Sequence, residues 1–169
     1  MEAKILAIIV YSDSTNCDQL GRKSEHPLSI TLGNIPGWRR QKLDSRAIIA
    51  YLPKMTSATQ NNDFRIKKLQ MFHNCLHRIF SPIVSMQQSQ KGFEALVDGK
   101  IYWFIPFVAM CLVDWPEACA YCMTYNSYNC QHPCHFCLVK RENLNNMQLH
   151  GDQIILRTHT TMQQNCRSI

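Results

Sequence analysis

Apolar runs and polar breaks alternate along the first part of the chain. Residues 3–12 form an apolar run, residues 28–35 alternate between apolar and polar positions, and residues 47–52 form a further apolar run that stops at Pro53. Short apolar runs bounded by polar segments, and a period of two, are both typical of strands. The pattern therefore predicts three strands, with a polar loop at residues 13–27.

A long helix is predicted after the third strand. Residues 61–63 offer side chains that can cap a helix, and apolar residues then recur at intervals of three and four: Leu69, Phe72, Leu76, Ile79 and Ile83. We expect Pro82 to end or kink this helix, because proline lacks the N–H that a helix interior uses. His73 and His77 lie one turn apart, but their basic neighbours favour a solvated face over a metal pair.

Two further strands are predicted at residues 93–97 and in the run up to Val113, joined by the turn Asp98-Gly99. A proline and an acid at Trp115-Pro116-Glu117 then indicate a helix start. The order of three antiparallel strands, a crossover helix and a strand parallel to the first describes an RNase H-like mixed α/β core. In such a core the first and fourth strands are neighbours.

Bulk composition indicates one globular core with a small appendage. The chain has 169 residues, of which 46% are hydrophobic and 18% charged, and a formal net charge of +6. The positive charge favours nucleic acid or another polyanion as partner. No apolar stretch reaches the roughly 20 residues that span a bilayer, and the first run is too short for a signal peptide, so we expect a soluble intracellular protein.

Two aspartates stand at the ends of predicted strands. Asp13 follows the first strand, and Asp114 follows the strand that ends at Val113, which is the fourth strand of the core. Strand ends at one sheet edge are places where carboxylates can converge on a hard divalent cation, and such cations drive phosphodiester chemistry. The alternative for each aspartate is an ordinary turn residue or helix cap.

Cysteines are concentrated in one segment. The chain has nine cysteines, and five of them lie between Cys119 and Cys137, which in a reducing compartment suggests a metal rather than disulfides. Cys134-x-x-Cys137 can place two thiolates on one tetrahedral zinc ion with a structural role, and Pro133 stiffens the turn. The remaining ligands can come from Cys130, which we favour, or from Cys119, Cys122, His132 and His135. Reduced cysteines without metal are the alternative.

Basic residues beside an aromatic form a candidate DNA-binding segment. Trp38, Arg39, Arg40 and Lys42 follow the second strand, and Lys140-Arg141 forms a smaller group. Cationic side chains bind phosphates and a tryptophan can stack on a base. A solvated charged face is the alternative.

Several short motifs occur in a fixed order along residues 8–140. They are Tyr11-Ser12-Asp13-Ser14-Thr15, His26-Pro27-Leu28-Ser29, Arg39-Arg40, Ala50-Tyr51-Leu52-Pro53, Leu76-His77-Arg78-Ile79-Phe80-Ser81-Pro82-Ile83 and Asp114-Trp115-Pro116-Glu117. In this order the chain resembles the Plavaka family of fungal transposases, whose wider relatives are the CACTA and KDZ types.

The resemblance implies an RNase H-like DDE/D domain that cuts and joins DNA strands with Mg2+ or Mn2+. Asp13 matches the family's first catalytic aspartate, Asp114 matches the second, and Cys134 and Cys137 match its Cys-x-x-Cys. It further implies transposon-end DNA as the partner, a nuclear location and homo-oligomerisation.

Departures from the family pattern predict an incomplete enzyme. Ser14 stands where the family usually has lysine, and no third acid is evident, because Glu142 and Asp152 follow the cysteines too soon. The chain also starts directly at the first strand, so we expect a truncated copy that is inactive alone. The alternative is a noncatalytic DNA- or protein-binding remnant of a transposon with structural zinc.

The predicted organisation has three segments. Residues 1–118 form a partial RNase H-like core, residues 119–140 form a Cys/His-rich zinc-binding segment, and residues 141–169 lack a clear pattern.

Overall fold

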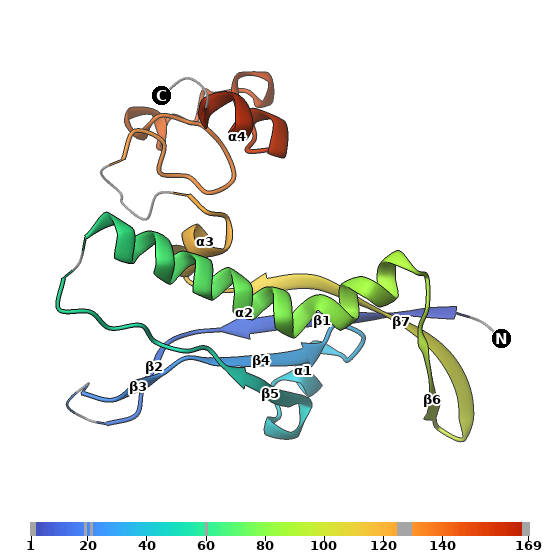
Figure 1. The fold of residues 1–169 in the computed structure, drawn as a ribbon. Coiled ribbons are helices and arrows are strands. Elements are labelled where there is room, and N and C mark those ends of the chain that lie inside the picture. The colour runs from blue at the N-terminus through green and yellow to red at the C-terminus, as the bar shows by residue number, and fades with distance from the viewer. Residues whose placement is uncertain (1–2, 19, 21, 60, 125–129, 167–169) are drawn as a thin grey trace. The chain divides into compact units, whose positions relative to one another are not determined.

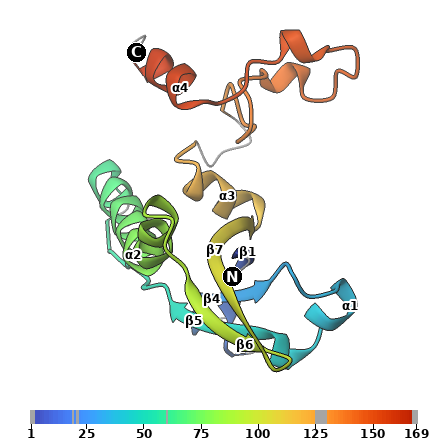
Figure 2. The ribbon, with the colours of Figure 1, turned by 90° about the vertical axis from the view of Figure 1, so that its right-hand side faces the viewer.

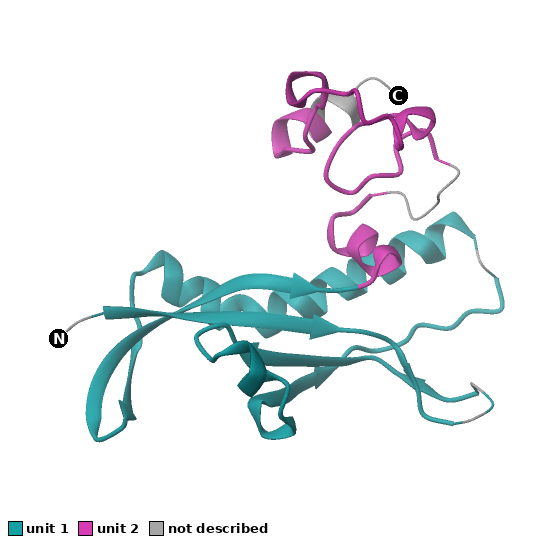
Figure 3. Cartoon of the chain, turned by 180° about the vertical axis from the view of Figure 1, so that it is seen from behind, with its two compact units in different colours: residues 1–113 teal, residues 114–169 magenta. Residues whose placement is uncertain are grey.

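The computed structural model describes residues 3–18, 20, 22–59, 61–124 and 130–166. The chain divides into two compact units, Met1–Val113 and Asp114–Ile169, which Figure 3 colours separately. Among the described residues, no helix is both long and apolar enough to cross a lipid bilayer. The three segments expected from the sequence stay predictions.

Unit 1 is built on a mixed sheet in which the described residues contribute five strands, in the order β5-β4-β1-β7-β6 (Figure 1). The bounds are β1 Ala3–Ser12, β4 Pro27–Leu32, β5 Arg46–Tyr51, β6 Phe93–Val97 and β7 Lys100–Leu112. β1 and β7 run parallel, and the other neighbouring pairs are antiparallel. The mixed α/β class and the predicted pairing of the first and fourth strands are therefore confirmed.

β1 is the central strand, and its sequence explains why. Ile8, Ile9 and Val10 are buried in succession, as expected where strands flank both edges and side chains pack on both faces. Pro106 in β7 is compatible with its strand because β6 pairs with β7 only as far as Phe104. Beyond that point a proline removes no ladder hydrogen bond to β6.

β4 ends at Leu32, three residues before the predicted strand end, because a side chain replaces the backbone ladder there. The Asn34 amide accepts a hydrogen bond from the Ala7 N–H at 2.8 Å and donates one to the Ile5 carbonyl at 3.0 Å. Gly33 allows this close approach, since an added Cβ would lie 3.1 Å from the Ala7 Cβ. Asn34 thus continues the contact with β1 after the strand has stopped.

The loops around β4 contain short elements that the sequence pattern did not predict. β2 (Thr15–Asn16) and β3 (Ser24–Glu25) form a small antiparallel pair within the predicted polar loop. Helix α1 (Gly37–Arg40) and the 3-10 turn η1 (Leu43–Ser45) connect β4 to β5. Elements this short have too few residues to show a period.

The predicted long helix is α2, Asn62–Gln88. The Asn61 side chain caps it by accepting a hydrogen bond from the Phe64 N–H at 2.9 Å, and α2 lies along one side of the sheet while α1 lies on the other (Figure 2). We expected Pro82 to end or kink the helix; it does not end the helix, because α2 continues through it, and the kink stays a prediction. The Ser81 hydroxyl donates to the Arg78 carbonyl at 3.2 Å, the acceptor whose usual helical donor Pro82 lacks.

Unit 2 has little regular structure. It contains α3 (Trp115–Tyr121), the 3-10 turns η2 (Arg141–Asn143) and η3 (Gly151–Gln153), and α4 (His159–Cys166). An isolated antiparallel bridge joins Cys137 to Leu156. The segment that lacked a pattern in the sequence thus pairs with the cysteine-rich segment.

Candidate metal and nucleic-acid sites

The parallel pairing of β1 and β7 brings two distant strand ends to the same edge of the sheet. Tyr11 lies opposite Leu112 in the ladder. Asp13 follows the last residue of β1, and Asp114 comes two positions after the end of β7. Asp13 belongs to unit 1 and Asp114 is the first residue of unit 2, so the sharing of one ion by both carboxylates stays a prediction.

The end of β1 is held by a buried polar contact. Ser12 is fully buried, and its hydroxyl lies 3.0 Å from His26 Nε2. The His26 ring in turn lies 6.4 Å from the ring of Phe72 on α2, measured between centroids. The Tyr11 hydroxyl donates to Asp13 Oδ2 at 3.5 Å. These contacts restrict the backbone on which the half-buried Asp13 carboxylate sits.

Asp114 is the N-cap of α3, which matches the plainer interpretation of this residue. Its Oδ1 accepts a hydrogen bond from the Glu117 N–H at 2.8 Å, and Pro116 lies in the first turn. An ionised carboxylate has about four lone-pair positions on its two oxygens. The cap therefore fixes the orientation of the side chain and is compatible with metal coordination through the remaining positions.

The candidate DNA-binding residues lie on the connection between β4 and β5. Trp38 is 70% exposed and Leu43 is 94% exposed, while Arg40 is half-buried and Lys42 exposed. We call residues 37–45 the basic connection. Exposed apolar and cationic side chains in one short segment suit contact with bases and phosphates.

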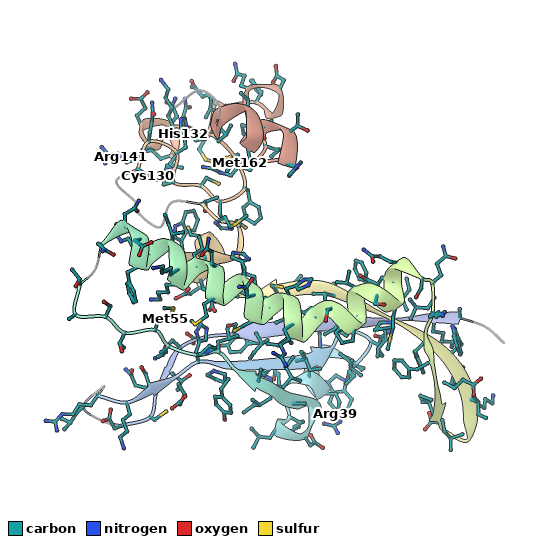
Figure 4. All side chains as sticks on the ribbon, in the orientation of Figure 1. Arg39, Met55, Cys130, His132, Arg141 and Met162 are labelled. Atoms are coloured by element: carbon teal, nitrogen blue, oxygen red, sulfur yellow. The ribbon has the colours of Figure 1, made fainter. Side chains whose placement is uncertain are left out.

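Arg39 differs from its neighbours because it is already paired. Its two terminal nitrogens donate to the two Asp44 carboxylate oxygens at 2.6 and 2.8 Å. The hydrogen bond from Arg39 is the largest cause that lowers the pKa of Asp44, and the same bond raises the pKa of Arg39. The basic pattern predicted Arg39 to be one of the phosphate-binding residues, whereas the fold gives it an intramolecular partner. Figure 4 labels Arg39 on this part of unit 1.

Cys134 and Cys137 lie in a turn whose backbone points donors at sulfur. The Phe136 N–H donates to Cys134 Sγ at 3.4 Å. Burial acts to raise the pKa of the Cys134 thiol, but hydrogen bonds from Phe136 and Cys137, together with the charge of Arg157, outweigh it and lower that pKa. Burial raises the pKa of Cys137, whose thiol interacts with that of Cys134. N–H groups directed at sulfur favour thiolates, the form that binds zinc.

Arg157, which no sequence motif singled out, holds this turn together. Its Nε donates to the carbonyls of Cys134 at 2.8 Å and Cys137 at 3.2 Å, and its Nη2 donates to the carbonyl of His132 at 2.8 Å. Its Nη1 contacts Met162 Sδ at 3.2 Å. Figure 4 labels His132 and Met162 in unit 2. The one sequence feature that could have pointed to Arg157 is the apolar triplet Ile154-Ile155-Leu156 before it, and three residues are too few to predict a strand.

No group of three or more His, Cys, Asp or Glu side chains lies within reach of one metal ion in the part of the chain that the structure describes. The magnesium role of Asp13 and Asp114, and the zinc role of Cys134, Cys137 and Cys130, therefore stay predictions. The donor types fit both metals, because Mg2+ prefers carboxylate oxygen and zinc prefers thiolate sulfur.

The chain thus combines a mixed α/β sheet, acids that follow two neighbouring parallel strands, and a cysteine turn. A family model of the Plavaka transposases matches residues 1–169. The chain belongs to the Plavaka transposase family. A comparison with curated proteins gives no match.

Proposed function

We propose that this chain forms the RNase H-like catalytic part of a DDE/D-type DNA transposase. The observation that supports this most is the parallel ladder of β1 and β7, whose register ends with Tyr11 opposite Leu112. Membership of the Plavaka transposase family makes the chain transposase-like and implies an interaction with DNA. We propose metal-dependent phosphodiester chemistry because the candidate residues are carboxylates at strand ends, which suit a metal ion, and not a nucleophilic side chain.

Asp13 and Asp114 are the proposed ligands of the catalytic metal. Bound Mg2+ would activate the attacking water or 3′-hydroxyl and stabilise the leaving oxygen of an in-line displacement. Tyr11 restrains Asp13 through its hydroxyl, and the cap bond to Glu117 N–H restrains Asp114. Ligands whose orientation is fixed before metal binds lose less conformational entropy on binding.

The chain alone is proposed to be inactive because a third acid is lacking. Of the two acids that follow the cysteines, Glu142 lies in η2 with its Oε1 3.9 Å from Lys140 Nζ, and Asp152 lies in η3. Both lie in 3-10 turns of unit 2, and neither directly follows one of the described strands along the chain. Neither supplies the acid that the family carries farther along the chain.

The basic connection is the proposed DNA contact. Trp38 would stack on a base, and Arg40 and Lys42 would bind phosphates. Cys134 and Cys137 are proposed to bind a structural zinc ion. Cys130 is the further ligand that the sequence favours. The N–H donor at Cys134 Sγ supports this assignment.

Iron-mediated cleavage of the intact polypeptide tests the magnesium assignment. Fe2+ that replaces Mg2+ generates radicals that cut the backbone next to its ligands. We expect cuts near both residue 13 and residue 114, and the loss of both in Asp13→Asn and in Asp114→Asn. Asp98→Asn is the matched control, because Asp98 lies in the β6–β7 turn at the other end of β7 with a φ of 50° that asparagine tolerates.

Cuts at only one of the two positions, or cuts unaffected by either substitution, would contradict the shared site. In a parallel assay with Mn2+ and transposon-end DNA, equal cleavage by the wild type and both variants would reject the catalytic assignment.

A noncatalytic DNA-binding remnant is the second candidate, and the cap role of Asp114 favours it. It predicts salt-dependent DNA binding through the basic connection, with no iron cuts at either aspartate.

A further inference from the structure

Helix α3 contacts the Cys134–Cys137 turn and has one cysteine within it, Cys119, and one at its C-cap, Cys122. Trp115 contacts His135, with ring centroids 4.7 Å apart in an edge arrangement. Cys119 and Cys122 follow Trp115 by four and seven positions, and this spacing places residues on one face of a helix. Cys119 is fully buried. A second Cys-x-x-Cys therefore begins on the helix that contacts the Cys134–Cys137 turn.

Arg157 connects the two cysteine pairs electrostatically. Its guanidinium donates hydrogen bonds to the carbonyls of Cys134 and Cys137. Burial raises the pKa of the Cys122 thiol, and the charge of Arg157 acts in the opposite direction. The Cys122 thiol in turn interacts with that of Cys119. Arg157 is therefore close enough to both cysteine pairs to act on each of them.

His135 adds a further observation at the same contact. Its Nδ1 is buried, and it has no hydrogen-bond partner among the described residues. A buried polar atom left unpaired is costly. A ligand that binds where α3 contacts the Cys134–Cys137 turn would lie beside this nitrogen and could give it a polar partner.

We propose that Cys119 and Cys122 complete a four-cysteine zinc site with Cys134 and Cys137, in place of Cys130. Two Cys-x-x-Cys pairs separated by a connecting segment are a spacing typical of structural zinc. This inference rests on the proposed structural zinc and specifies its ligands. Since no three of these side chains lie within reach of one ion in the described residues, metal binding would draw the two pairs together, as coupled binding and folding does elsewhere.

Thiol protection in the intact wild-type chain tests the ligand set without any variant. The protein is loaded with Zn2+, alkylated, and each modified cysteine is located by mass spectrometry, with and without a chelator. We expect zinc-dependent protection of Cys119, Cys122, Cys134 and Cys137, while Cys130 and the exposed Cys17 react equally in both conditions. Protection of Cys130 in place of Cys119 and Cys122 would overturn the ligand set.

Cobalt substitution supplies a second readout. The charge-transfer absorption of Co2+ scales with the number of thiolates, so Cys119→Ser and Cys122→Ser should each retain about three quarters of the wild-type intensity. Cys130→Ser is the matched control and should keep the full intensity. Reduced Co2+ absorption in Cys130→Ser, together with full absorption in Cys119→Ser, overturns this inference but leaves the zinc proposal intact. A wild type that binds neither metal overturns both.

Discussion

Single side chains in this protein carry functions that their residue type alone does not reveal. Arg39 and Arg40 are adjacent, but Asp44 engages only Arg39 in a two-bond pair. The Ser45 hydroxyl donates to the Arg40 carbonyl at 2.8 Å, which shapes the turn that brings Asp44 to Arg39. If the basic connection is the DNA contact proposed above, Asp44 within it should weaken that contact by engaging Arg39.

Asp44→Asn should strengthen DNA binding several-fold at low salt. The substitution removes a negative charge and releases Arg39, so we expect one more phosphate contact and a salt dependence steeper by about one unit. Binding to duplex DNA at several salt concentrations measures both. Asp63→Asn is the control, because Asp63 pairs with Lys67 at 2.7 Å in another exposed ion pair, and it should leave the slope unchanged.

The same pair has a defined pH dependence. The pKa of Asp44 is lowered in the folded state, so the stabilisation by the pair is present above the unfolded pKa of aspartate. It is lost as the pH falls through the lower, folded pKa. Release of Arg39 by acid should therefore reproduce part of the Asp44→Asn effect, and an identical salt slope for both proteins at every pH would contradict the role given to this pair.

Arg157 shows a comparable dependence on context in unit 2. One guanidinium satisfies three carbonyls of residues that lie more than 19 positions earlier in the chain. A lone arginine after a short apolar triplet gives no indication of these partners. The fold assigns it a positioning role for the cysteine turn.

At the scale of elements, α2 illustrates how a local defect is repaired. Pro82 removes a backbone donor, and the Ser81 hydroxyl supplies one to the Arg78 carbonyl. The capped start at Asn61 and the apolar face with the buried Leu76 hold the part of the helix that precedes the proline.

A double-mutant cycle measures this repair. Ser81→Ala should destabilise the chain by about 1 kcal/mol, because an acceptor loses its hydrogen bond. Pro82→Ala should stabilise it, since the backbone N–H returns. In the Pro82→Ala background, Ser81→Ala should cost much less, and urea denaturation of the four proteins gives the coupling. Equal costs in both backgrounds would show that the hydroxyl does not compensate for the proline.

At the scale of the whole molecule, unit 1 depends on the central position of β1. Val10 lies opposite Ile30 of β4 and Cys111 of β7 and is fully buried. This one strand joins the antiparallel half of the sheet to the β6–β7 hairpin. It also carries Asp13 to the sheet edge where β7 ends.

Val10→Ala should therefore destabilise the chain by about 2 kcal/mol, the usual cost of removing buried methyl groups. Ile5→Ala on the same strand is the control, because Ile5 is 63% exposed, and its effect should stay within about 0.5 kcal/mol. Chemical denaturation of both variants provides the measurement. A larger loss in the Ile5 variant would contradict the central placement of β1.

Local sequence patterns were enough to predict the strands of the main sheet, the long helix, their order and the family. Apolar period and cap residues act locally, so β1, β5, α2 and the β6–β7 hairpin could be predicted from neighbouring residues. The short elements around β4, the passage of α2 through Pro82, the Arg39–Asp44 pair and the carbonyl contacts of Arg157 could not, because each is fixed by a specific hydrogen-bond partner rather than by a repeating pattern.

The order of elements had predicted β7 parallel beside β1, and the ladder confirms it residue by residue. The contact of α3 with the Cys134–Cys137 turn through Trp115 and His135 was visible only in the folded chain. Strand order and helix orientation result from burial shared among segments far apart in the chain. The apolar pattern of one segment predicts which of its residues are buried, but it does not predict which distant segment packs against them.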